Sequence, residues 1–283
     1  MFMSTKIFSA GFLVFLFCLQ AQAGDYERPL VVVIPSHNNA DWYARNLDSV
    51  FTQEYDNYRV IYCDDASTDN TYNLVQAYII AHGYEDKITL LHNDISQGAL
   101  FNHYQAVSRC RDHEIVINLD GDDWLPHNQV FAHINSVYAD PEVWMTYGQY
   151  RNYPSGIIGQ CKELPAGVII KNVYREYDWV TSHLRTFYAK LFKKIRRADF
   201  IDDNPDDKID NDQFFRSACD MAFMFPMLEM AGKHSRFIPD VLYEYNQKTT
   251  QNIFKTQLVL QLHNSYVIRA RRKYAPIAQL FEQ

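Results

Sequence analysis

Several features that mark common protein classes are missing from this sequence of 283 residues. It has no linker rich in glycine or serine and no internal repeat. No G-x-G-x-x-G turn follows a predicted strand, which argues against a nicotinamide-dependent dehydrogenase. The cysteines beyond residue 24 have neither C-x-x-C spacing nor a histidine at ligand distance, so a zinc site is not expected. One disulfide would suit an oxidising compartment, but the sequence does not pair these cysteines, which are Cys63, Cys110, Cys161 and Cys219.

Positive charge is also scarce. The chain has 27 Lys and Arg against 34 Asp and Glu, a net charge of -7, so we expect no nucleic-acid partner. Apolar residues, in contrast, make up 47% of the chain and allow a sizeable core. The one basic cluster lies in a stretch that favours a helix, and we interpret it as a solvated face; it comprises Lys193, Lys194, Arg196 and Arg197.

The N-terminus has the pattern of a targeting segment. Lys6 precedes an apolar run over residues 7–19, and Ala21-Gln22-Ala23 then forms a small-residue cleavage site, as in secretory signal peptides. The run is shorter than the roughly 20 residues of a spanning helix, although its flanks could extend it into an uncleaved anchor. We therefore assign residues 1–24 to a signal peptide or short membrane anchor. We expect the protein in the secretory pathway or exported, with membrane association through this segment if it is retained.

Strand and helix patterns alternate in the first half of the chain. Continuous β-branched runs such as LVVVI at residues 30–34 are typical of strands buried on both faces, and we expect Pro35 to end this one. The alternation favours an α/β fold with a parallel sheet flanked by helices. Strands are predicted at residues 30–34, 58–63, 88–91, 114–119 and 143–147, and helices at residues 41–51, after residues 67–69 and at 99–107.

The second half is less regular. Residues 201–212 are acidic and are predicted to form a loop. Apolar residues at helical spacing predict one helix over residues 221–230 and a terminal amphipathic helix over residues 253–274. We assign residues 25–250 to one domain and residues 251–283 to a C-terminal helical tail.

Three polar clusters stand directly after predicted strands: Pro35-Ser36-His37-Asn38, residues 64–69, and Asp120-Gly121-Asp122-Asp123. The carboxyl ends of parallel strands share one edge of a sheet, so these clusters should converge on one crevice. Adjacent carboxylates repel each other unless a cation lies between them, and Mg²⁺ and Mn²⁺ prefer such oxygen ligands. A second Asp-x-Asp, at residues 210–212, is interpreted as a solvated turn because no strand precedes it.

A family resemblance rests on two of these segments. Residues 31–71, VVVIPSHNNADWYARNLDSVFTQEYDNYRVIYCDDASTDNT, resemble the opening of a family 2 glycosyltransferase, and INLDGDDWLP resembles that family's metal-binding segment. The similarity covers roughly residues 28–150 and extends more loosely to about residue 250. It implies the A-type glycosyltransferase fold, a single Rossmann-like nucleotide-diphospho-sugar transferase domain. It also implies inverting, metal-dependent transfer of a sugar from a nucleotide-sugar, with a UDP-sugar favoured, to a glycan, lipid or protein acceptor.

The resemblance also implies roles for individual residues. Asp64 or Asp65 would hydrogen-bond the base or ribose of the donor. Asp120 would face the ribose or sugar, with Asp123 as a helper, and Asp122 would coordinate Mn²⁺ or Mg²⁺. The nucleoside would be held by groups at Pro35, Ser36, His37 and Asn38.

On the acceptor side, Asp220 stands at the start of a late helix and matches the family's catalytic base. Cys219 occupies a position where an acidic residue or glycine is expected, and an aspartate at a helix start is also an ordinary cap. The alternatives for the base are Asp210 and Asp212. The loop that covers the donor sugar and acceptor is matched by Trp179, Ser182 and His183, which could equally be structural, and residues 243–246 resemble the family's closing strand.

Two other functions share parts of this pattern. A phosphohydrolase of the haloacid dehalogenase type also has a strand followed by Asp-x-Asp-Gly, but Asn118 occupies the position of its nucleophilic aspartate. A catalytically silent nucleotide- or sugar-binding protein of the same fold is the remaining alternative. Export is difficult to reconcile with donors made in the cytosol, whereas a lumenal or membrane-anchored enzyme would have access to them.

Overall fold

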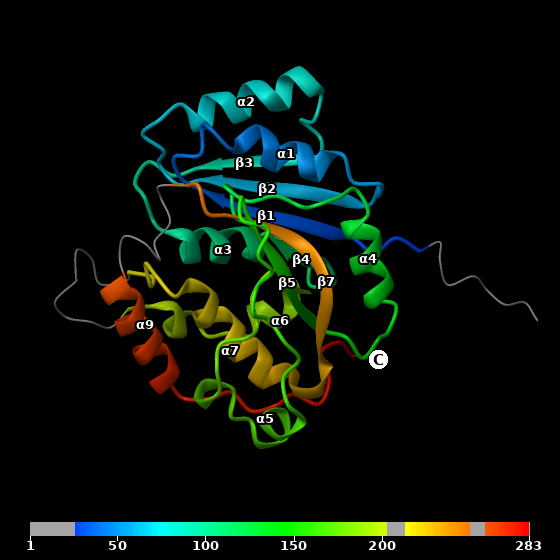
Figure 1. Cartoon of the computed structure of the whole chain (residues 1–283), viewed down its shortest axis with the longest axis vertical. Helices are drawn as coiled ribbons and strands as arrows, with labels where there is room; N and C mark the ends of the chain where they lie inside the picture. The colour runs from blue at the N-terminus through cyan, green and yellow to red at the C-terminus, as the bar shows by residue number, and fades with distance from the viewer. Residues whose placement is uncertain (1–25, 203–212, 250–257, 283) are drawn as a thin grey trace, which may run out of the picture.

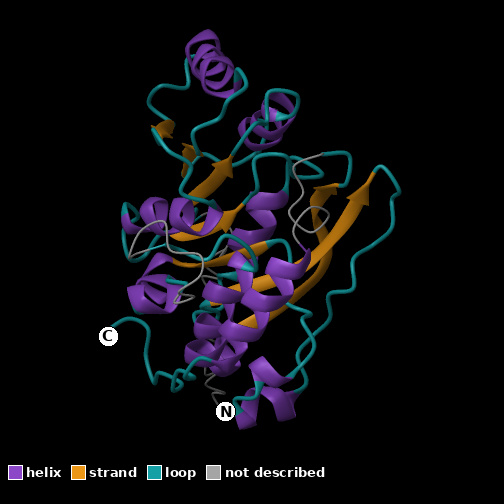
Figure 2. Cartoon of the chain, turned by 90° about the vertical axis from the view of Figure 1, so that its left-hand side faces the viewer, coloured by secondary structure: helices purple, strands orange, loops and turns teal. Residues whose placement is uncertain are grey.

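The computed structural model describes residues 26–202, 213–249 and 258–282. Within these residues the central element is a seven-stranded sheet in the order β3-β2-β1-β4-β6-β5-β7. Strand β6 runs antiparallel to both of its neighbours and the other pairs are parallel, which confirms the mostly parallel sheet. The strands twist progressively across the sheet (Figure 2). Their bounds are β1 Leu30–Ser36, β2 Tyr58–Asp64, β3 Ile88–His92, β4 Ile115–Asn118, β5 Met145–Tyr153, β6 Arg185–Tyr188 and β7 Ser235–Asn246.

Helices cover both faces of this sheet (Figure 1). Strand β1 shows why its sequence is uninterruptedly apolar. Val31 and Val33 pack into the core under α3, α6 and α7, whereas Leu30, Val32 and Ile34 pack into the core under α1, α2 and α4. Successive side chains of a strand point to opposite faces, so both faces of β1 need apolar residues. The helices are α1 Tyr43–Phe51, α2 Thr71–His82, α3 Ala99–Ser108, α4 Val130–Val137, α5 Ala166–Lys171, α6 Ala189–Lys193, α7 Cys219–Ala231 and α9 Leu258–Ala270, with 3₁₀ turns η1 Tyr174–Glu176, η2 Arg197–Phe200 and η4 Gly232–His234.

The predicted end of the first strand at Pro35 is wrong. Strand β1 continues through Pro35 to Ser36. Proline lacks a backbone N–H and is excluded only where a neighbouring strand needs that donor. Strand β4 ends at Asn118, opposite Val33, so Pro35 has no strand partner on that side. Its carbonyl instead accepts a hydrogen bond from the N–H of Gly121 at 3.0 Å, which ties the end of β1 to the Asp-x-Asp segment.

Two further expectations are corrected or refined. The basic cluster does not lie on one helix, because α6 ends at Lys193 and the chain resumes a helical turn only at Arg197. Two of its members form ion pairs, Lys193 with Asp112 at 3.0 Å and Arg196 with Asp199 at 2.9 Å. All four predicted mature cysteines are free thiols, and Cys63, Cys110 and Cys161 are buried.

Some predictions fall outside the described residues. These are the N-terminal segment 1–24, the Asp210–Asp212 turn and the beginning of the C-terminal tail, so the domain boundaries stay predictions. The rest of the tail packs on the domain: Asn264 of α9 donates a hydrogen bond to Ser217 at 3.1 Å, and Ile268 is buried in the core. Among the helices of the described ranges, none combines the length and apolar character that crossing a bilayer requires.

A buried ion pair fixes this tail, and its loss should destabilise the protein. Arg175 in η1 donates to both oxygens of Glu229 in α7, at 2.5 and 2.9 Å, and to the carbonyl of Ile268 at 2.6 Å. Arg175→Ala would leave Glu229 buried and unpaired, so we expect a loss of about 3–5 kcal/mol in the free energy of unfolding. Urea unfolding measures the loss. The matched control Arg236→Ala breaks an exposed pair with Asp140 and should cost less than about 1 kcal/mol; equal losses would contradict this assignment.

Candidate active site

The three predicted polar clusters meet at one edge of the sheet. Ser36 and Asp64 are partners in the register of β1 and β2. The N–H of Asn38 donates to Ser67 Oγ at 2.9 Å, and the Asn38 side-chain oxygen accepts from the N–H of Thr68 at 2.8 Å. Because Gly121 is bonded to Pro35, the Asp-x-Asp segment lies beside the other two clusters. The convergence expected from the parallel topology is therefore present.

The approach between two of these clusters is so close that it requires glycine. A Cβ atom on Gly121 would lie 2.7 Å from both Cβ and Oγ of Ser36 and 2.8 Å from the side-chain nitrogen of Asn39. Ser36 cannot move away without disturbing the hydrogen bonds that its hydroxyl oxygen accepts from Tyr62 at 2.7 Å and Asn39 at 2.9 Å. The glycine thus sets how closely the Asp-x-Asp segment can lie against the end of β1.

Gly121→Ala should consequently destabilise the fold. The added methyl group forces the neighbouring backbone or Ser36 to shift, and overpacking of this kind costs typically about 1–3 kcal/mol. Thermal unfolding measures the effect. Gly167→Ala is the matched control, since Gly167 lies in α5 with nothing within 4 Å of an added Cβ. That change should be neutral or stabilising by about 0.5–1 kcal/mol; a melting temperature that falls equally in both variants would refute the close-approach argument.

Asp64 and Asp65, which the sequence left as alternatives, differ sharply in their surroundings. The Asp65 carboxylate accepts four hydrogen bonds of 2.7–2.8 Å, from Asn93, Ser96 and the N–H groups of Gln97 and Gly98. Burial alone would raise the pKa of Asp65, but these bonds outweigh it and lower the pKa. Asp65 therefore anchors the loop that leads into α3.

Asp64 retains unused bonding capacity. Its Oδ2 accepts from the N–H of Ser67 at 3.2 Å and lies 2.9 Å from Nδ1 of His92. Its Oδ1 is buried, and among the residues that the structure describes none forms a hydrogen bond with it. Since a buried acceptor without a partner is costly, this oxygen is suited to a donor group on a ligand. Of the two aspartates, the geometry favours Asp64 for contact with a nucleoside.

The side chains of His37 and Asn38 are both engaged in hydrogen bonds at this edge of the sheet. His37 Nδ1 lies 2.8 Å from the carbonyl oxygen of Asp65, and the Asn38 amide nitrogen lies 3.1 Å from His37 Nε2. Asn38 has a φ of 53°, in the left-handed region that asparagine tolerates better than most residues. These contacts hold the backbone of the first cluster against the second.

Asp120 and Asp122 differ in their electrostatic surroundings. Burial would raise the pKa of Asp120, but His183, His103 and Arg185 outweigh it and lower the pKa to about 2. Asp120 Oδ2 lies 3.6 Å from Nε2 of His183. Burial, followed by the negative charge of Asp120, raises the pKa of Asp122 to about 7. Within the described ranges no ion pair is formed by the Asp122 carboxylate, so its charge is left without a partner there.

These two carboxylates fit a divalent cation. Both offer hard oxygen ligands, and a cation beside Asp122 would balance the charge that burial and Asp120 disfavour. No group of three or more His, Cys, Asp or Glu side chains in the described part of the chain is arranged to hold a metal. Mg²⁺ and similar ions often take only one or two protein carboxylates and complete their coordination with water and substrate phosphates.

Asp123 is occupied by contacts with β7. Its carboxylate accepts hydrogen bonds from the hydroxyl of Tyr243 and the N–H of Asn246, both at 2.6 Å. The Asn246 side chain also donates to the carbonyl of Asp122 at 3.0 Å. Asp123 therefore ties the Asp-x-Asp segment to the sheet. Its role as a helper in donor binding stays a prediction, and the geometry shows both of its oxygens engaged by the chain.

The predicted base lies in the first turn of α7. Asp220 Oδ2 accepts from Nη2 of Arg185 at 2.8 Å, and Oδ1 accepts from the N–H of Met221 at 2.9 Å. About 31% of the Asp220 side chain is exposed, against 3% for Arg185. The carboxylate is thus held in one orientation by a buried guanidinium while part of it faces solvent.

The predicted sugar loop divides into two parts. Ser182 Oγ lies 3.1 Å from Nδ1 of His183, and the His183 ring stacks on Tyr243 with centroids 4.3 Å apart. His183 also approaches Asp120, and Arg185 bonds both Ser182 and Asp220, so these residues connect the Asp-x-Asp segment with the start of α7. Trp179 instead packs against Phe225 of α7, with ring centroids 5.3 Å apart, at the margin of the core.

Two residues of this site were not predicted. Arg185 links Asp220 to Ser182, which it approaches at 3.3 Å. The sequence feature that could have indicated this role is an arginine within a short apolar strand. An arginine buried there needs a carboxylate partner. His103 is buried in α3 near Asn118 and Asp120, and burial lowers its pKa. Only the helical spacing of α3 hinted that His103 faces inward.

Comparisons with known proteins agree with this geometry. Residues 31–202 match the model of Glycosyl transferase family 2. The chain is 33% identical over 102 residues to the putative colanic acid biosynthesis glycosyl transferase WcaA of Escherichia coli, a match over 36% of each protein. It is 25% identical to glycosyltransferase GlyG of Streptococcus pneumoniae, over 81% of this chain and 74% of that protein. The match to WcaA thus spans about a third of that relative's length.

Solved structures show the same fold. TarS of S. aureus in complex with UDP-GlcNAc has a TM-score of 0.57 at 13% identity, over 80% of this chain and 60% of that one. The mannosyltransferase PcManGT of Pyrobaculum calidifontis, in complex with GDP-Man and Mn²⁺, has a TM-score of 0.57 at 20% identity, over 89% of this chain and 67% of that one. With the family model covering most of the sheet and the Asp-x-Asp segment, the chain belongs to glycosyl transferase family 2.

Proposed function

We propose that this protein is a glycosyltransferase that moves a sugar from a nucleotide-sugar to an acceptor hydroxyl with the help of a divalent ion. The observation that carries the proposal is the meeting of Asp64, Asp120 and Asp122 at one sheet edge, where Asp122 has an unbalanced charge. Structural relatives were solved with UDP-GlcNAc, or with GDP-Man and Mn²⁺. These names support a nucleoside-diphosphate donor, and we favour a UDP-sugar.

Each residue of the site has a separate role in the proposed reaction. Asp64 would bind the base or ribose through Oδ1, Asp120 would face the ribose or sugar, and Asp122 would coordinate Mn²⁺ or Mg²⁺. The ion would balance the charge that develops on the departing diphosphate. Asp220 would accept the proton of the acceptor hydroxyl as that oxygen attacks the anomeric carbon, a single displacement that inverts the configuration. Arg185 would keep the Asp220 carboxylate in position.

The acceptor belongs to the same proposal. Two relatives are named as glucosyltransferases that act on α-D-GlcNAc-diphosphoundecaprenol, and they are 23% and 28% identical to this chain over their matched regions. A sugar linked to a lipid diphosphate is therefore the acceptor type that we favour among glycan, lipid and protein acceptors. Retention of the N-terminal segment as an anchor would keep the enzyme beside such an acceptor.

Titration and hydrolysis together test this function. Purified protein is titrated with UDP-glucose, UDP-GlcNAc and GDP-mannose with and without Mn²⁺, and release of the nucleotide is then followed. We expect binding that strengthens with Mn²⁺, followed by slow donor hydrolysis. Binding without hydrolysis or transfer would favour the catalytically silent alternative. Absence of any nucleotide binding would overturn the assignment of the crevice.

A further inference from the structure

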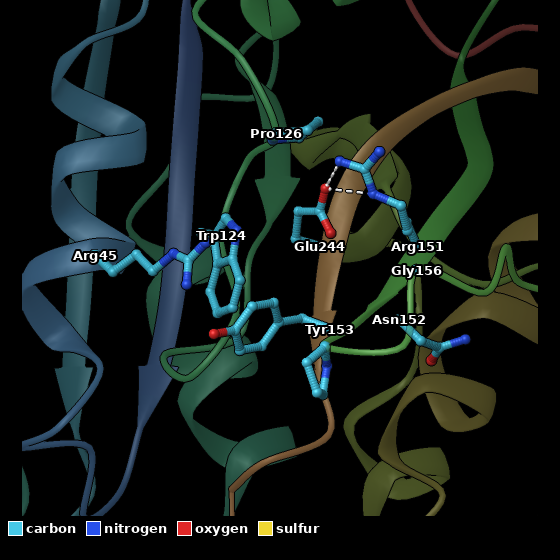
Figure 3. Close-up of a pocket in the computed structure, with 9 residues that line it drawn as sticks. Arg45, Trp124, Pro126, Arg151, Asn152, Tyr153, Gly156 and Glu244 are labelled. Carbon is cyan, nitrogen blue, oxygen red and sulfur yellow. Dashed lines mark hydrogen bonds and ion pairs between the residues drawn. The ribbon is translucent and has the colours of Figure 1, made fainter.

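A pocket lies beside the Asp-x-Asp segment, at the ends of β5 and β7. Its volume is about 280 Å³, just below the range of roughly 300–1,000 Å³ typical for small-molecule sites. That size suits one sugar ring better than a whole nucleotide-sugar. We call it the edge pocket, and its main walls are formed by Arg45, Trp124, Pro126, Arg151, Tyr153 and Glu244 (Figure 3).

One wall presents a pre-oriented cation. The Arg45 guanidinium of α1 lies 3.5 Å from the centroid of the Trp124 ring and 4.8 Å from that of Tyr153. Trp124 is only 5% exposed and also stacks on Trp42, so this platform is rigid. Within the described residues Arg45 forms no ion pair or hydrogen bond, and its side chain is exposed. Stacking therefore fixes the plane of the guanidinium and leaves its N–H donors for a ligand.

The opposite wall offers a donor and an acceptor side by side. Arg151 directs its Nε, at 2.8 Å, and its Nη2 to the same oxygen of Glu244, Oε1. The Glu244 side chain is 8% exposed, and that of Arg151 is 47% exposed. In the described part of the chain no hydrogen bond reaches Glu244 Oε2. A nearly buried carboxylate oxygen thus remains available to a hydroxyl group.

The local charge is opposite to that of the whole chain. Arg45 and Arg151 flank the edge pocket, and Lys248 Nζ lies 5.4 Å from the Tyr153 ring centroid. Glu244 is the only carboxylate among the lining residues, whereas the protein carries a net charge of -7. Among the lining residues Arg151 is paired with Glu244, so Arg45 leaves a net positive charge that makes this site attractive to an anion.

We propose that the edge pocket binds one acid-bearing sugar unit of the acceptor, a pyranose ring with a carboxylate or phosphate substituent. Arg45 binds the acidic group, Glu244 Oε2 and Arg151 bond ring hydroxyls, and the Tyr153 ring packs on the apolar face of the sugar. Backbone bonds of 3.3 and 2.9 Å join Trp124 to Glu244 in both directions. Because Trp124 follows Asp122 by two residues, the bound unit would lie next to the donor crevice. Only its role as part of the acceptor rests on the proposed function; the binding itself does not.

Titration of the full chain with four probes tests the edge pocket. The probes are glucuronate, glucose 6-phosphate, glucose and inorganic phosphate, followed by tryptophan fluorescence and NMR. We expect at least one acidic sugar to bind tenfold or more tightly than both glucose and inorganic phosphate. The comparison of the two acidic sugars identifies carboxylate or phosphate as the substituent. Equal affinity for glucose and both acidic sugars, or for phosphate and both acidic sugars, would overturn the proposal.

Variants locate the binding. Arg45→Ala should weaken the acidic sugar tenfold or more and Tyr153→Ala should weaken it, whereas Tyr153→Phe should retain it. Arg272→Ala removes an exposed arginine of the tail and serves as the charge-matched control without effect. Unchanged affinity in Arg45→Ala would refute the site. Titration of the unsubstituted protein with UDP and Mn²⁺ reports the donor crevice separately. If the unsubstituted protein binds nucleotide but no acidic sugar, only the edge pocket is overturned. If it binds an acidic sugar but no nucleotide, only the proposed function is overturned.

Discussion

Asp122→Asn should reduce donor hydrolysis and transfer by about 10³-fold or more while leaving the chain folded. An oxygen ligand and its charge are lost where negative charge develops on the leaving diphosphate, and removal of one such electrostatic contact typically costs about 10²–10³-fold. Here the ion itself would be lost as well, because Asp122 is the carboxylate proposed to hold it. Nucleotide release from a UDP-sugar in the presence of Mn²⁺ measures the effect.

The same variant should be more stable than the parent, whereas most substitutions lower the stability of a protein. The pKa of Asp122 is about 7 in the folded chain, above its ordinary value of 3.8. Ionised Asp122 therefore destabilises the fold at pH 8, and this penalty shrinks as the pH falls from about 7 to about 4. In the absence of metal, Asp122→Asn should melt at a higher temperature than the parent at pH 8, with a smaller gain at pH 5.

Metal completes this test. Mn²⁺ should raise the melting temperature of the parent by mass action and should leave that of Asp122→Asn nearly unchanged. Asp86→Asn removes an exposed carboxylate in the turn before β3 and should behave as the parent in every measurement. Turnover that survives in Asp122→Asn, or a Mn²⁺ shift equal to that of the parent, would remove the metal-binding role from Asp122.

The central sheet was predictable because its signal is local. Alternate residues of β1 enter different cores, so the LVVVI run had to be apolar throughout, and the same logic located β2 and β4. The placement of polar clusters after these strands then followed from parallel topology alone. Pro35 was misjudged because whether its missing N–H matters depends on where β4 ends, and that boundary is set by a segment some 80 residues away.

The roles of neighbouring aspartates could not be separated by sequence for the same reason. Asp64 and Asp65 are adjacent and chemically identical, yet only Asp65 is saturated by the loop before α3. Asp122 and Asp123 differ because β7, more than 100 residues later, supplies the two donors that bind Asp123. Motif matching identifies the set of carboxylates, whereas long-range hydrogen bonds decide which of them remains open to a ligand.

Asp220→Asn should lower the rate of transfer by about 10²–10⁴-fold, the range for loss of a general base, with unchanged affinity for nucleotide and Mn²⁺. Asparagine keeps an acceptor oxygen for Arg185 or for the N–H of Met221, so the start of α7 should persist. What is lost is the ability to accept the proton of the acceptor hydroxyl. Single-turnover transfer, with donor affinity measured in parallel, separates this effect from impaired binding.

A mere helix cap would give a different result. Loss of a cap costs typically about 1 kcal/mol of stability and leaves turnover of the folded fraction intact, so the melting temperature and the rate must be compared in the same variant. Cys219→Ser alters the adjacent residue of the same turn, does not touch the proposed proton acceptor, and should retain transfer. If Asp220→Asn also retains transfer, the base lies elsewhere, and Asp210→Asn and Asp212→Asn become the variants that must abolish it. Because Asp220 is held by a buried arginine beside Ser182 and His183, we expect the rate to fall in Asp220→Asn alone.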